Sequence, residues 1–97
     1  MRVEVERTME IRYSKSSLKF LAKLEKSQVR RIVKAVEGLT QTPPQGDIKP
    51  LQGYSDNRMR LRVGSYRVIY RIAHDGTISV LFVLDIGNRG DIYKKGE

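Results

Sequence analysis

Residues Asn57–His74 have the sequence NRMRLRVGSYRVIYRIAH, in which basic and apolar side chains alternate. Alternation of this kind is typical of a strand that buries one of its two faces. The dipeptide Gly64-Ser65 interrupts the pattern once, and two residues are the length of a tight hairpin turn. We therefore predict two antiparallel strands that pair Val63 with Tyr66 and carry apolar side chains on one face, among them the core residues Tyr66 and Tyr70.

The other face of this predicted hairpin carries arginines, with no acidic residue between Asn57 and His74. The predicted register places Arg62 opposite Arg67 and Arg58 opposite Arg71. Like charges directly opposite each other across a ladder are destabilising. A face that accepts this repulsion twice is expected to hold a polyanion, and the alternative is an ordinary solvated polar face. The arginines of the face are Arg58, Arg60, Arg62, Arg67 and Arg71.

Upstream of the hairpin, the sequence predicts one strand and two helices. Alternation over Met9–Tyr13 predicts a strand, and residues 1–8 are expected to be a disordered leader or an extension of it. An amphipathic helix with Leu18 and Leu21 on its apolar side follows the N-cap candidates of Ser14–Ser17. A second helix, capped by Ser27, continues to Leu39, and the two are expected to form an antiparallel hairpin.

Downstream of the helices, turn residues alternate with apolar segments. Residues Thr42–Asn57 are predicted to form a loop, and His74–Thr77 a second tight turn with His74 at the surface. The segment Ile78–Leu84 is apolar at both even and odd positions, so it is predicted to be a central strand that is covered on both faces. The segment Asp85–Asp91 is predicted to be a loop, and Ile92–Lys95 a short strand or a single turn.

These elements together predict one α+β domain over residues 9–97, because 97 residues are enough for one core. The predicted order is β-α-α-β-β-β. A helix hairpin packs on one face of a twisted antiparallel sheet and buries every apolar stripe, while the arginines occupy the face that the helices leave open.

The composition narrows the possible partners. A formal charge of +8 favours nucleic acid, an anionic membrane surface or an acidic protein. The chain has no cysteine and one histidine, so neither a disulfide framework nor a Cys- or His-based metal site is available, and we expect no metal and no cofactor. No apolar run approaches the roughly 20 residues of a membrane span. We therefore expect a cytoplasmic protein that does not bind a membrane.

Three segments together carry a resemblance to a known family: Lys49–Gly53, Arg58–Tyr70 and Val83–Tyr93. In this order they resemble the RelE branch of the RelE/ParE toxin superfamily, over about Met9–Lys94. Members are small toxins of type II toxin–antitoxin systems, and RelE-like members cleave mRNA in the ribosomal A site. The resemblance implies a RelE-like fold and a metal-independent endoribonuclease that inhibits translation. The alternatives are a ParE-like inhibitor of DNA gyrase and a non-catalytic member that binds only nucleic acid or its antitoxin.

The resemblance also implies a mechanism and the catalytic residues. In RelE-like cleavage the 2′-hydroxyl of the substrate attacks the adjacent phosphate, and guanidinium groups stabilise the charge that develops on the phosphoryl oxygens. Arg67 matches the phosphate-stabilising arginine of the family, and Arg89 matches a second one. Tyr93 matches a C-terminal tyrosine whose ring can stack on an unpaired base and whose hydroxyl can share a proton.

Arg58 and Arg60 occupy positions where some members carry lysines that transfer protons. Arginine stays protonated in proteins, so these two side chains are expected to stabilise charge but to be poor general bases. Five further basic residues in or next to the matched segments are expected to bind RNA, with the antitoxin as the alternative partner of the first two: Arg62, Arg71, Lys49, Lys94 and Lys95.

The implied partners are the mRNA, the 70S ribosome and a cognate antitoxin. The antitoxin is expected to supply an acidic and apolar segment, at least partly helical, that wraps the toxin. It would mask the arginines or displace the C-terminal tyrosine.

Overall fold

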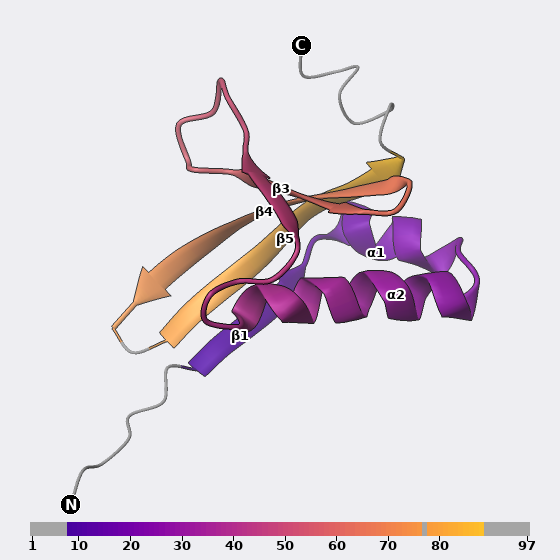
Figure 1. The fold of residues 1–97 in the computed structure, drawn as a ribbon, viewed down its shortest axis with the longest axis horizontal. Helices are drawn as coiled ribbons and strands as arrows, with labels where there is room; N and C mark the ends of the chain where they lie inside the picture. Colours follow the sequence, from indigo (N-terminus) through magenta and orange to yellow (C-terminus); the bar gives the residue numbers. More distant parts are fainter. Residues whose placement is uncertain (1–7, 77, 89–97) are drawn as a thin grey trace, which may run out of the picture.

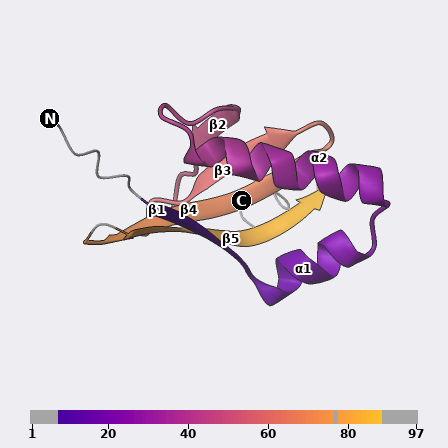
Figure 2. The same cartoon turned by 90° about the horizontal axis from the view of Figure 1, so that it is seen from below.

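The structure is a computed structural model that describes residues 8–76 and 78–88. The described strands form one five-stranded sheet in the order β1-β5-β4-β3-β2, and both helices lie on the same side of it (Figures 1 and 2). The predicted α+β architecture is thus confirmed. Its elements are β1 (Thr8–Tyr13), α1 (Lys15–Ala22), α2 (Lys26–Glu37), the 3-10 turn η1 (Gly38–Thr40), β2 (Asp47–Pro50), β3 (Met59–Val63), β4 (Tyr66–Asp75) and β5 (Ile78–Asn88).

Strands β3 and β4 form the predicted hairpin. Val63 pairs with Tyr66, and Arg62 pairs with Arg67. Gly64 opens the turn with a φ of 59°, a left-handed conformation that glycine adopts without steric cost. The ladder ends where Met59 pairs with Tyr70, so Arg58 lies just before β3 and its predicted pairing with Arg71 is not part of the ladder.

The pairing at both edges of the sheet corrects the expected antiparallel order. Strand β1 lies parallel to β5, with Ile11 beside Leu81. At the other edge, the predicted loop contains strand β2, which pairs antiparallel with β3. Strand β5 also continues to Asn88, through residues that were predicted to be a loop. Alternation fixes which side chains share a face, but the direction of a strand depends on which neighbour it meets.

The N-cap of helix α1 contacts a β-bulge in strand β5. The register of β4 against β5 shifts between Ile69 and Tyr70, which leaves Leu84 as the extra residue of β5. Ser14 is the N-cap: its Oγ accepts a hydrogen bond from the backbone N–H of Ser17 at 3.1 Å and lies 2.9 Å from the Leu84 carbonyl oxygen, to which it donates. The sequence therefore located this cap correctly, and the cap joins the helix to the sheet.

Two details of the helices differ from the prediction. Helix α2 begins at Lys26 with Glu25 as its N-cap, whereas Ser27 was expected to cap it. The backbone of Glu25 is extended and its carbonyl accepts the first helical hydrogen bonds, so the helix starts before Ser27. Leu18 is exposed, although its position suggested the apolar side of α1.

The core fills the space between the helices and the sheet. Ile32 and Val36 of α2 are fully buried against side chains of the three central strands, including Val68 and Leu81. Tyr70 belongs to this core as predicted, and burial raises the pKa of its hydroxyl to about 12. Tyr66 is half-buried and donates a hydrogen bond from its hydroxyl to Oε1 of Gln28 at 2.7 Å. Within the described part of the chain, no helix has the length and apolar character needed to cross a membrane.

Candidate nucleic-acid interface

The arginines of β3 and β4 lie on the sheet face opposite the helices. Leu61, Val63 and Val68 belong to the core beneath the helices, so the residues between them point to the opposite face. The register places Arg62 directly across from Arg67, with Cβ atoms about 5 Å apart as in other cross-strand pairs. We call this surface the arginine face and define it by Arg60, Arg62, Arg67 and Arg71.

Two side chains of the arginine face are almost completely buried. Arg60 and Arg67 are each only 4% exposed, and Arg62 and Arg71 are half-buried. Burying a guanidinium ion is unfavourable unless partners compensate for the lost water. Arginines that serve only for solubility remain in solvent, so this burial argues against an ordinary solvated surface and for groups held in fixed positions.

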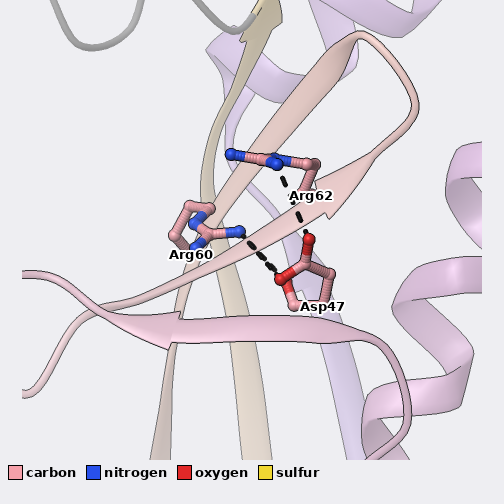
Figure 3. A network of polar contacts seen from close by, with 3 residues as sticks. All are labelled: Asp47, Arg60 and Arg62. Carbon is pink, nitrogen blue, oxygen red and sulfur yellow. Dashed lines mark hydrogen bonds and ion pairs between the residues drawn. The ribbon is translucent and has the colours of Figure 1, made fainter.

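Asp47 of the edge strand β2 is shared by two of these arginines (Figure 3). Nη1 of Arg60 donates to the Asp47 carboxylate at 3.3 Å and to the Asp47 backbone carbonyl at 3.2 Å. Nε of Arg62 lies 3.9 Å from the other carboxylate oxygen. The Asp47 side chain remains 57% exposed, so one accessible carboxylate balances part of the charge of two arginines.

Arg58 does not join the arginine face, although the sequence predicted it there. Its Nε donates to both carboxylate oxygens of Asp56, at 3.1 and 3.0 Å, and its guanidinium carbon lies 4.5 Å from the centroid of the Tyr54 ring. Both partners belong to the loop between β2 and β3. Arg58 precedes the paired part of β3, and its side chain pairs with Asp56 of the loop.

The other predicted binding residues divide into two groups. Lys49 of β2 is exposed and pairs with Arg60, so it lies on the same sheet face. Arg71 also lies on this face, with its guanidinium carbon 4.9 Å from the centroid of the Phe82 ring. The second group is outside the described residues, and its roles remain predictions: Arg89, Tyr93, Lys94 and Lys95.

Sequence reasoning missed Asp47 and Tyr54. The residues Asp47-Ile-Lys-Pro50 alternate in the manner of a short strand, and this signal was available within the segment assigned to a loop. Tyr54 is an isolated aromatic residue in a polar loop, four residues before Arg58. Neither position could be connected to its arginine without the fold.

The arrangement suits the binding of phosphate groups. Guanidinium groups bind two phosphoryl oxygens at once and can stabilise negative charge as it develops on them. Arg60, Arg62 and Arg67 come from the adjacent strands β3 and β4 and lie on the same face of the sheet. Across residues 8–76 and 78–88, no three His, Cys, Asp or Glu side chains cluster so that they could hold a metal ion.

Comparison with known families gives one match that spans most of the chain. The model of the ParE toxin of the type II toxin–antitoxin system, parDE, matches residues 11–93. No curated protein matches the chain with significant sequence similarity.

Solved structures with the same fold include two at more than a quarter identity. The archaeal RelE–RelB complex from Pyrococcus horikoshii contains a chain that is 29% identical, with a TM-score of 0.64, and the match covers 86% of this chain and 97% of that one. The toxin–antitoxin complex RelBE2 from Mycobacterium tuberculosis contains one that is 27% identical, with a TM-score of 0.62, over 88% of this chain and 100% of that one. The YoeB/ParE toxin from Agrobacterium tumefaciens shares the fold at 22% identity and a TM-score of 0.70, over 84% of this chain and 99% of that one.

Proposed function

The chain belongs to the ParE toxin family of type II toxin–antitoxin systems, within the RelE/ParE superfamily, and we propose that it is an endoribonuclease that cleaves mRNA in the ribosomal A site. The observation that carries this proposal is the placement of Arg60, Arg62 and Arg67 on the sheet face opposite the helices, with Arg62 directly across from Arg67.

In the proposed reaction, the 2′-oxygen of the mRNA forms a bond to the adjacent phosphorus and the bond to the 5′-oxygen breaks. Water takes the proton of the 2′-hydroxyl, and water or the Tyr93 hydroxyl donates a proton to the 5′-oxygen, so that the products carry a cyclic phosphate and a 5′-hydroxyl. Arg67 and Arg60 stabilise the charge on the phosphoryl oxygens. Neither arginine takes the proton, because both stay protonated. Tyr93 and Arg89 keep the proposed roles of base stacking or proton sharing and of a second phosphate contact.

The partners of the proposed toxin are the 70S ribosome and an antitoxin with an acidic, partly helical segment. Two of the similar structures are complexes of a RelE-type toxin with its antitoxin. The proposed antitoxin neutralises the arginine face or covers the C-terminal residues, and both places suit an acidic segment.

Substitution of Arg67 tests the proposal. Arg67→Ala is expected to lower the rate of mRNA cleavage by about 100- to 1000-fold, the loss typical of one transition-state donor. Arg67→Lys is expected to recover only a small part of it, because an ammonium group cannot bind two oxygens in the same geometry. The measurement is mapping of mRNA 5′ ends after induction of the toxin without its antitoxin.

Arg30→Ala is the matched control, since Arg30 is exposed on α2, on the opposite side of the sheet. Wild-type protein and this control should cut within ribosome-protected codons. Circular dichroism and urea denaturation establish that the Arg67 variants are folded. Folded Arg67 variants that cleave as well as wild type would contradict the assignment of the arginine face.

A second candidate is inhibition of DNA gyrase, which the ParE family match favours. The same cultures distinguish the two functions. Intact mRNA, together with DNA damage and trapped gyrase, would support a gyrase poison and exclude the endoribonuclease. Growth that is unaffected by induction would instead indicate a member that only binds its antitoxin or nucleic acid.

A further inference from the structure

Tyr54 is an exposed aromatic residue in the loop that joins β2 to β3. It is 43% exposed, although large apolar side chains elsewhere in the described residues are mostly buried. One side of its ring is covered by the guanidinium group of Arg58, whose central carbon lies 4.5 Å from the ring centroid. A cation above the face of a ring is a favourable contact, and it leaves the rest of the ring open to a second flat group.

The loop holds this pair of side chains in place. Nε of Arg58 donates to both carboxylate oxygens of Asp56, at 3.1 and 3.0 Å. The backbone N–H of Leu51 donates to the Arg58 carbonyl at 3.0 Å and closes the loop at its base. The hydrogen bonds from the Arg58 side chain to described residues use Nε, and a guanidinium group carries further N–H donors on its two Nη atoms.

The pair lies at the end of the arginine face. Arg58 precedes Arg60 by two residues, which corresponds to about 7 Å along an extended chain. Arg60 in turn lies beside Arg62 through their shared contact with Asp47 (Figure 3). A single nucleic-acid strand whose phosphates contact the arginine face would therefore bring a neighbouring nucleotide to the loop.

We propose that Tyr54 and Arg58 form a stacking site for one unpaired base of the RNA strand whose phosphates lie along Arg60, Arg62 and Arg67. The inference rests on the proposed endoribonuclease function and adds a base-binding position to it. Unpaired bases stack on aromatic rings and guanidinium planes, and the donors of Arg58 are complementary to the phosphate or base edge beside the stacked base. Tyr54 acts here as a positioning residue and takes no part in bond breaking.

The alternative is that Arg58 and Tyr54 only brace the loop. The two readings differ in what the ring is needed for. If the pair only stabilises the loop, loss of the Tyr54 ring changes the free energy of unfolding and leaves RNA affinity unchanged. In a stacking site, it weakens binding of a strand that carries bases and has little effect on the salt dependence of binding, because no phosphate contact is lost.

The experiment measures binding of a fluorescein-labelled 2′-O-methyl RNA hexanucleotide to the full chain by fluorescence anisotropy. The methyl groups remove the attacking hydroxyl, so the probe is not cleaved. Tyr54→Ala is expected to weaken binding by about 5- to 150-fold, the range for the loss of one base–aromatic stack. Tyr54→Phe keeps the ring and should bind within about twofold of wild type, because stacking does not need the hydroxyl.

Leu18→Ala is the matched control, because Leu18 is a comparably exposed apolar side chain on α1. It should bind RNA as wild type does. A scan of hexanucleotides with one abasic position each then locates the stacked base. One abasic position should weaken binding to wild type and have little further effect on Tyr54→Ala, because both changes remove the same stack.

The stacking site would be overturned if Tyr54→Ala bound the hexanucleotide as tightly as wild type does. It would also be overturned if every abasic position weakened binding to Tyr54→Ala as much as it weakens binding to wild type. If Arg67→Ala still abolishes cleavage in that case, the proposed function stands and only the base site is lost. If wild-type protein cleaves mRNA but binds no hexanucleotide, the stacking site is also overturned. If neither Arg67 nor Tyr54 affects cleavage or RNA binding, both proposals fail together.

Discussion

At the scale of single residues, Asp47 offsets part of the positive charge of the arginine face. Its carboxylate contacts Arg60 at 3.3 Å and Arg62 at 3.9 Å, from a side chain that is 57% exposed. A phosphate that binds these arginines competes with this carboxylate. Asp47 thus contacts both guanidinium groups and offsets part of the positive charge that the proposed RNA ligand would meet.

Neutralising Asp47 is expected to strengthen RNA binding. Asp47→Asn should bind the 2′-O-methyl hexanucleotide about 1.5- to 5-fold more tightly, the worth of one solvent-screened ion pair. The plot of log affinity against log salt should become steeper by about 0.7, as for one more phosphate contact to a single strand. Anisotropy titrations at several salt concentrations measure both quantities.

Glu10→Gln provides the comparison for this substitution. Glu10 lies on β1, at the opposite edge of the sheet, and pairs with Arg12 at 3.2 Å in solvent. The Glu10→Gln substitution removes one negative charge, as Asp47→Asn does, but it leaves the contacts of Asp47 with Arg60 and Arg62 intact. Equal gains for the two variants would show that net charge alone acts and that Asp47 does not compete with RNA.

At the scale of elements, the β3–β4 hairpin carries the site, and the bulge in β5 fixes the first helix to it. Gly64 allows the tight turn that places Arg62 opposite Arg67. On the far side of β4, the bulged Leu84 presents its carbonyl to Ser14, the N-cap of α1. The same cap therefore ends β1, starts α1 and satisfies a carbonyl of the neighbouring strand.

Removal of this cap should weaken the whole domain. Ser14→Ala is expected to lower the free energy of unfolding by about 1 to 2 kcal/mol, since it removes the helix cap and a hydrogen bond to a backbone carbonyl. Urea denaturation followed by circular dichroism measures the change. Ser27→Ala is the control, because Ser27 is exposed and Glu25, not Ser27, is the N-cap of α2. Equal stability of the two variants would exclude the capping role.

At the scale of the whole molecule, the two faces of the sheet have different tasks. One face packs against the helices through residues such as Val36, Leu61 and Tyr70, and the other presents arginines. Part of the formal charge of +8 is therefore gathered on the arginine face. The core supplies the stability that holds those charges close together.

The buried Tyr70 gives this stability a pH dependence at high pH. Its pKa is raised from 10.0 to about 12 by burial, so unfolded chains lose the proton first as the pH rises. The stabilisation that the protonated Tyr70 gives to the folded state is complete below about pH 10 and is lost between about pH 10 and 12. It amounts to about 2 to 3 kcal/mol. Burial and the nearby charge of Glu37 also raise the pKa of Tyr13, so Tyr13 changes the stability in the same direction.

Denaturant titrations of wild type and Tyr70→Phe between pH 8 and pH 12 test this expectation. The free energy of unfolding should fall more steeply for wild type, because the variant has no proton to lose at this position. The difference between the two proteins removes the contribution of lysine titration. Parallel curves would mean that Tyr70 does not ionise on unfolding in this range.

The sequence by itself determined the hairpin, its register and the separation of the two faces. Alternation along Met59–Val63 and Tyr66–Asp75 assigns each side chain to a face, and a slip of one residue would exchange the core and the arginines. The two helices and the cap at Ser14 were likewise predictable, because helix periodicity and capping depend on neighbouring residues. The matched segments also pointed to the correct superfamily.

Only the tertiary structure decided the neighbours of these elements. It set β1 parallel to β5, turned part of a predicted loop into β2, and directed Arg58 toward Tyr54 and Asp56. The ion pair of Asp47 with Arg60 joins residues 13 positions apart and exists only because β2 pairs with β3. Local patterns specify the conformation of a segment and the face of a side chain. The partner of a buried charge depends on which distant strand the fold places beside it.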